Sequence, residues 1–81
     1  MIPDTWDELW LGYTIYVHPK DYPDRYVVRA WTVGDEGEVV FNPEVVVLTV
    51  TLEEARAYIP VGLINVGREP DDDPVIAESW L

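Results

Sequence analysis

Residues 45–60 read VVVLTVTLEEARAYIP. The β-branched and apolar part, Val45–Thr51, predicts a strand. Its apolar run is nearly continuous. We therefore expect either a central strand buried on both faces or one packed between the core and the N-terminal aromatic residues. Thr51 and Glu54 have the spacing of a capping box, which predicts a helix of roughly two turns that Pro60 ends. The stretch thus predicts a strand that leads directly into a short helix.

The segments on either side of this stretch have strand character. A turn signal at Gly34–Gly37 lies between two of them, and residues 38–41 extend the resulting hairpin. The expected strands are residues 13–18, 26–33, 45–51, 61–66 and 75–80, the fourth interrupted by Gly62. The order β-β-β-α-β-β predicts a small α+β domain, in which one short helix packs on a face of an antiparallel sheet.

Length and composition indicate one folded domain over residues 1–81. Residues 1–12 form an N-terminal aromatic arm or helical turn, and residues 13–81 form the α+β core. Hydrophobic residues make up 48% of the chain, which has four tryptophans and five tyrosines but no cysteine. This composition suits a packed core and excludes disulfides and thiolate chemistry. With no apolar signal core and no apolar run of about 20 residues, we expect a cytoplasmic protein.

The net charge of −11 is the most unusual property of the chain, since 16 carboxylates accompany five Lys and Arg residues. Direct contact with nucleic acid is disfavoured, because its backbone needs cations to neutralise it. An anionic membrane is disfavoured for the same reason. Two interpretations remain open. The acidity serves solubility alone, or it complements a basic surface on another protein, such as a nucleic-acid-binding groove.

Partner binding has candidates in two acidic clusters and in the N-terminal aromatic residues. Trp and Tyr are enriched among interface hot spots, and a mimic of DNA needs a dense row of carboxylates. Asp73 is also expected to accept hydrogen bonds from backbone N–H groups in its turn. The candidate residues are Trp6, Trp10, Asp35, Glu36, Glu38, Glu69, Asp71, Asp72 and Asp73.

Catalytic and cofactor motifs are missing from the sequence. His18 is the single histidine and Ser79 the single serine, and neither lies in a pattern typical of a nucleophilic triad. The glycines match no phosphate-binding loop. Residues 71–73 offer carboxylates for Ca²⁺ or Mg²⁺, but their spacing does not fit an EF-hand, and a solvated acidic turn is the simpler interpretation. We expect no enzymatic activity and no cofactor.

The second half of the chain has a motif pattern that resembles a group of small uncharacterised bacterial and phage proteins. The pattern comprises Thr51–Arg56, Ile59–Pro60, Asp72–Pro74 and Glu78 followed by Trp80. The resemblance covers about residues 26–81 and implies no known activity. By type, the small size, acidity and lack of cysteine are similar to phage-encoded inhibitors of bacterial defence, including anti-CRISPR proteins, which act in the host cytoplasm.

Three functional hypotheses follow from the sequence. The first is an inhibitor that binds a basic, nucleic-acid-binding surface of a partner protein, as a mimic of DNA. The alternative is a homodimeric accessory or structural protein in which the aromatic arm packs onto a neighbouring copy. A small metal-binding domain or enzyme ranks last.

Overall fold

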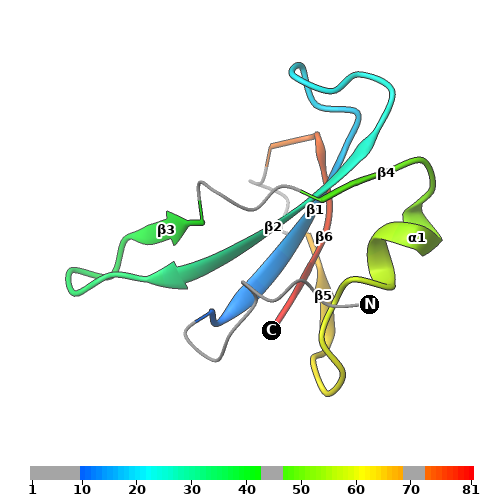
Figure 1. Cartoon of the computed structure of the whole chain (residues 1–81). Coiled ribbons are helices and arrows are strands. Elements are labelled where there is room, and N and C mark those ends of the chain that lie inside the picture. The colour runs from blue at the N-terminus through cyan, green and yellow to red at the C-terminus, as the bar shows by residue number, and fades with distance from the viewer. Residues whose placement is uncertain (1–9, 43–46, 69–72) are drawn as a thin grey trace.

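The computed structural model describes residues 10–42, 47–68 and 73–81, and it contains six strands and one helix (Figure 1). The predicted small antiparallel sheet with one short helix is confirmed, and the chain is mostly β. The elements are β1 (Gly12–Val17), β2 (Tyr26–Val33), β3 (Val39–Phe41), β4 (Val47–Thr49), α1 (Leu52–Arg56), β5 (Asn65–Gly67) and β6 (Ile76–Trp80).

The strands form one sheet in the order β3-β2-β1-β6-β5, with β4 also paired to β2. Every pairing is antiparallel. β3 pairs with the C-terminal part of β2, and β4 pairs with its N-terminal part. β2 therefore pairs with three strands. It is the longest strand, and it lies beside β1 along its length (Figure 1).

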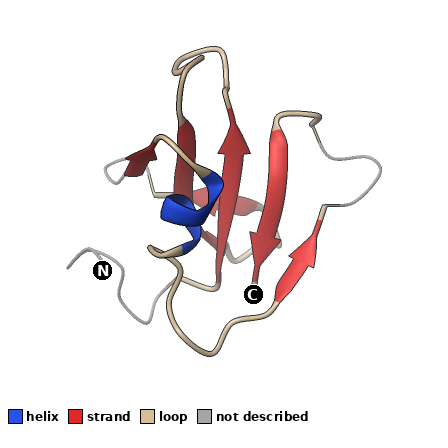
Figure 2. Ribbon diagram, turned by 90° about the vertical axis from the view of Figure 1, so that its right-hand side faces the viewer, coloured by secondary structure: helices blue, strands red, loops and turns tan. Residues whose placement is uncertain are grey.

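The core lies on the face of the sheet that meets α1. Ile15 of β1 pairs with Val28 of β2, and both are fully buried. Tyr13 and Ala30 form the next pair on this face. Ala55 of α1 is also fully buried and belongs to the same cluster. Figure 2 shows α1 in front of the strands. Because successive side chains of a strand point to opposite faces, the intervening side chains of β1 and β2 lie on the other face of the sheet.

The helix α1 begins with the predicted capping box. Glu54 N–H donates to the Thr51 hydroxyl at 3.1 Å, and Thr51 N–H donates to a Glu54 carboxylate oxygen at 3.2 Å. The helix has five residues, so the prediction of roughly two turns was too long. The ring of a proline clashes with helical backbone at the preceding residue. The helix therefore ends at Arg56, and turns lead the chain to Pro60.

Two predicted strands differ in the structure. β4 is a short strand that pairs with β2 alone among the described residues, and its Leu48 is 44% exposed. The prediction of a central strand buried on both faces was therefore wrong, and β1 lies at the centre instead. The predicted strand 61–66 begins only at Asn65. Its first part is a turn, because Gly62 has a φ of 98° and Val61 is 99% exposed.

Candidate functional site

A pocket of about 660 Å³ lies on the face of the sheet opposite the core. Tyr16 of β1 and Val27 of β2 line it, and Val27 is only 2% exposed. Arg29 also lines the pocket, and Phe41 of β3 contributes an aromatic ring. The pocket is therefore built on three adjacent strands, on the side chains that alternate with the core residues.

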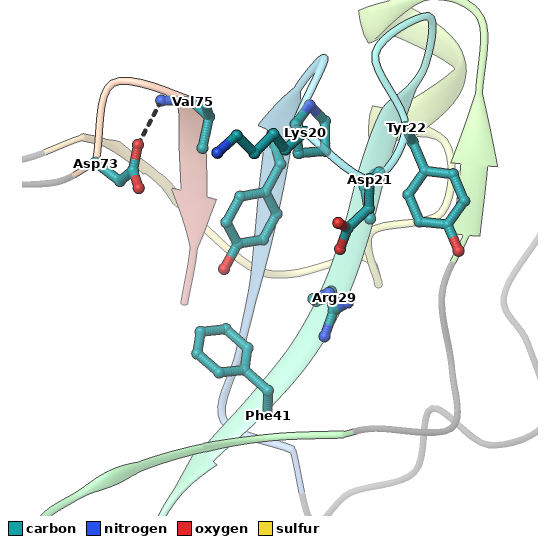
Figure 3. Close-up of a pocket in the computed structure, with 10 residues that line it drawn as sticks. Lys20, Asp21, Tyr22, Arg29, Phe41, Asp73 and Val75 are labelled. Carbon is teal, nitrogen blue, oxygen red and sulfur yellow. Dashed lines mark hydrogen bonds between the residues drawn. The ribbon is translucent and has the colours of Figure 1, made fainter.

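The loop between β1 and β2 forms one wall of this pocket. It starts at His18, a non-glycine residue with a φ of 45°, whose N–H donates to the Arg25 carbonyl at 2.9 Å. Inside the loop, Tyr22 N–H donates to the Pro19 carbonyl at 2.9 Å. These turns place the side chains of residues 20–22 at the pocket (Figure 3).

Four charged side chains line the pocket: Lys20, Asp21, Arg29 and Asp73. In Figure 3 the Asp21 carboxylate points toward Arg29, but across the described ranges the one ion pair is Arg56 with Glu78. Arg29 is half-buried, and its guanidinium forms no hydrogen bond with any residue that the structure describes. The pocket thus combines aromatic walls with a guanidinium that forms no ion pair within the described ranges.

Asp73 is the one residue of the predicted C-terminal acidic cluster that the structure describes. One of its carboxylate oxygens accepts a hydrogen bond from Val75 N–H at 3.1 Å, which confirms the expected backbone contact. Its side chain is exposed and lies at the pocket. Glu69, Asp71 and Asp72 lie outside the described residues.

The second candidate feature is the β2–β3 hairpin. Its turn is closed by hydrogen bonds from Gly34 N–H to the Glu38 carbonyl and from Gly37 N–H to the Gly34 carbonyl, with Gly37 at a φ of 84°. The predicted partner-binding residues Asp35, Glu36 and Glu38 are all exposed in it. Exposed apolar side chains follow directly on the strands: Val33, Val39, Val40 and Phe41.

The hairpin turn and the pocket's loop lie at opposite ends of β2 (Figure 1). Asp73 contributes to the pocket at the loop end. The structure therefore separates Asp73 from Asp35, Glu36 and Glu38 by the length of a strand. Of the two predicted aromatic residues, Trp10 is half-buried and packs against the core cluster, and Trp6 lies outside the described residues.

A buried carboxylate, Glu78 of β6, is the feature that the sequence did not predict. It is 5% exposed and accepts hydrogen bonds from Arg56 Nε at 2.7 Å and Arg56 Nη2 at 2.8 Å. Asn65 and Trp80 donate to it at 2.9 and 3.0 Å. The hydrogen bonds from Arg56 hold the pKa of Glu78 below its ordinary value, despite burial, which acts in the opposite direction.

Two signals in the sequence indicate these missed residues. Arg29 shares a strand face with Val27 and Trp31, so it is an isolated cation on an apolar face. Glu78 similarly lies two residues before Trp80 on an alternating strand. A charged residue on an apolar strand face needs either a partner or a ligand, and the structure gives a partner to Glu78 alone.

Neither a metal site nor a membrane-spanning helix is present in the part of the chain that the structure describes. There, no three His, Cys, Asp or Glu side chains come together in an arrangement that could hold a metal ion. The helix in the same residues is too short and polar to span a membrane.

The geometry above stands without support from known relatives. The chain matches no protein-family model, and no curated protein or solved structure is significantly similar to it.

Proposed function

We propose that this chain is a protein-binding domain that docks the β2–β3 hairpin onto a basic surface of a partner protein. The observation that carries the proposal is the composition of the hairpin. Three exposed carboxylates at its turn adjoin exposed apolar side chains on its strands.

Charge complementarity supports a basic partner. Asp35, Glu36 and Glu38 form no ion pair with any described residue, so a partner's Lys and Arg side chains can satisfy them. The whole chain carries a net charge of −11. Such a field accelerates encounter with a basic surface and suppresses contact with acidic ones.

The apolar residues of the hairpin supply the contact area that exposed charges lack. Val39 and Val40 are 55% and 42% exposed, and Phe41 is 38% exposed. Stable interfaces combine an apolar centre with a polar rim, which is the arrangement of these side chains beside the acidic turn. β3 also ends the strand order of the sheet. Within the described residues, its outer backbone groups therefore offer an edge to an extended partner segment.

Inhibition follows if the basic surface is a nucleic-acid-binding groove. The hairpin turn presents three carboxylates, whereas DNA carries one charge per about 1.7 Å of its axis. The hairpin would therefore occupy a short section of such a groove and exclude nucleic acid locally. The chain would thus inhibit its partner by local exclusion of nucleic acid.

The test compares two variants of equal net charge. Asp35→Asn with Glu36→Gln removes two carboxylates from the hairpin turn. Asp24→Asn with Glu53→Gln removes two exposed carboxylates elsewhere and is the matched control. Each protein is immobilised and used to capture partners from host lysate, and the partner captured by the wild type is identified and titrated by calorimetry.

We expect the control to retain the partner and the hairpin variant to lose most of its affinity. Wild-type affinity should fall between about 0.1 M and about 1 M salt, as the Debye length shortens from about 10 Å to about 3 Å. Equal binding by the two variants would refute the hairpin as the contact, and salt-independent binding would refute its electrostatic part.

A homodimer is the alternative favoured by β3, which pairs with β2 alone in the described part of the sheet. Two copies would then pair along β3, but each brings a net charge of −11, which opposes association at low ionic strength. Sedimentation at low and high salt separates the two proposals. A dimer that strengthens with salt supports self-pairing, and a monomer at all concentrations removes it.

A further inference from the structure

We infer that the pocket on the face opposite the core binds a small aromatic monocarboxylate, whose carboxylate pairs with Arg29 and whose ring packs against Tyr16 and Phe41. The pocket shares Phe41 with the hairpin, but the inference rests on Arg29 and does not depend on a contact between the hairpin and a protein.

Arg29 is the main argument for a ligand. Its side chain lies on the middle of β2, beside Val27, which is 2% exposed. Arg56 shows how this chain satisfies a guanidinium elsewhere, with two hydrogen bonds to Glu78. Arg29 has no comparable acceptor in the described ranges, although 16 carboxylates are present in the chain. A guanidinium presents its donors in a planar fork that matches a carboxylate in two parallel hydrogen bonds.

The walls of the pocket indicate a flat, apolar ligand body. The rings of Tyr16 and Phe41 lie with centroids 6.5 Å apart and planes inclined by 56°. Tyr22 adds a third ring at the loop side, and it is 36% exposed (Figure 3). Aromatic rings prefer offset or edge-to-face contacts at such separations. The volume of about 660 Å³ falls within the range of small-molecule sites.

The other charged side chains around the pocket favour a ligand with one negative charge. Asp21 and Asp73 line it together with Lys20 and Arg29, so the four formal charges balance. A single negative charge that pairs with Arg29 is tolerated. A phosphate dianion brings a second negative charge, which the carboxylates of Asp21 and Asp73 repel. A cationic ligand is repelled by Arg29. A monocarboxylate is therefore favoured over both.

The test uses three probes that share one ring system: a naphthoate, the corresponding naphthamide and the corresponding naphthyl phosphate. Binding to the full chain is measured by calorimetry and by shifts of backbone amide signals in NMR spectra. We expect the naphthoate to bind about tenfold or more tightly than the neutral naphthamide. It should also bind more tightly than the phosphate, and the shifts should concentrate in residues 16–22 and 27–29.

Two substitutions assign the effect to Arg29. Arg29→Gln should reduce naphthoate affinity to the level of the naphthamide. Arg25→Gln removes one exposed cation from the adjacent loop, outside the pocket lining, and should leave naphthoate binding unchanged. Thermal unfolding and amide spectra establish that both variants are folded.

Four outcomes would overturn the inference. They are no binding of any probe in the millimolar range, equal affinity for the acid and the amide, tighter binding of the phosphate, and naphthoate binding that survives Arg29→Gln in the folded variant.

Discussion

Arg56 of the helix donates two hydrogen bonds to Glu78 of the last strand, at 2.7 and 2.8 Å. The two residues differ in environment, since 45% of the Arg56 side-chain surface is exposed but only 7% of the Glu78 side-chain surface. Glu78 pairs with Ile15 on the core face of the sheet. The ion pair thus joins α1 to β6 beside the core and uses neither the pocket nor the hairpin. We interpret it as a structural contact.

Glu78→Gln tests this interpretation through stability. The amide keeps the shape of the side chain but loses the charge that Arg56, Asn65 and Trp80 contact. The amide NH₂ group would also replace an oxygen that now accepts hydrogen bonds, so it would face N–H donors. We expect a loss of about 2 kcal/mol in the free energy of unfolding, measured by urea denaturation. The exposed Glu53→Gln is the control, and an equal effect in both variants would contradict the structural role.

Acid should weaken the fold through the same carboxylate. The pKa of Glu78 is lowered from 4.5 in the folded state, first by the hydrogen bond from Arg56. A lowered folded pKa gives stability that is present above the unfolded pKa and is lost as pH falls through the folded pKa. The stability difference between the wild type and Glu78→Gln should therefore shrink below about pH 4.5. A difference that stays constant from neutral pH down to acid would disprove this linkage.

Gly12→Ala should disturb the face of the sheet opposite the core. A Cβ at Gly12 would overlap the indole ring of Trp31 and lie 2.8 Å from Cδ2 of Leu81. Trp31 would have to move, which threatens its hydrogen bond to the Thr14 hydroxyl, now 3.0 Å long. We expect a loss of about 1–3 kcal/mol, as for other overpacked sites. Gly37→Ala is not a suitable control because of its positive φ, so Ala57→Gly at the exposed end of α1 serves as a mild reference.

Thr51→Ala should shorten or fray α1. The substitution removes the hydroxyl that accepts from Glu54 N–H, and loss of such a cap costs about 1 kcal/mol. Thr51→Ser retains the hydroxyl and should restore most of the stability. Thermal unfolding followed by circular dichroism measures both variants. If the serine variant is no more stable than the alanine variant, the cap does not stabilise this helix.

Local sequence signals predicted the elements well, because their causes are local. The capping box at Thr51 and the turn at Gly34–Gly37 depend on residues within a few positions of each other. Strand order depends on distant pairings, such as Tyr13 with Trp80. That is why a central strand was one of two interpretations left open for the apolar run of Val45–Thr51, although β4 pairs with one strand in the described part of the sheet.

The candidate sites were predicted only in part, for a similar reason. The acidic turn at Asp35 and Glu36 is a local run of charges, and the structure places it on an exposed hairpin. The pocket requires Arg29, Phe41 and Asp73 to meet from separate elements. Alternation along β2 placed Arg29 with apolar neighbours, but nothing local shows that Asp21 and Asp73 line the same pocket.

The position of β2 has a consequence for how the two candidate sites can be separated. This one strand carries Val27 and Arg29 under the pocket and continues into the acidic turn, while β1, β3 and β4 all rely on its backbone. A deletion within β2 would therefore disturb the scaffold of both sites. The hairpin and the pocket must be dissected by changes in side chains alone.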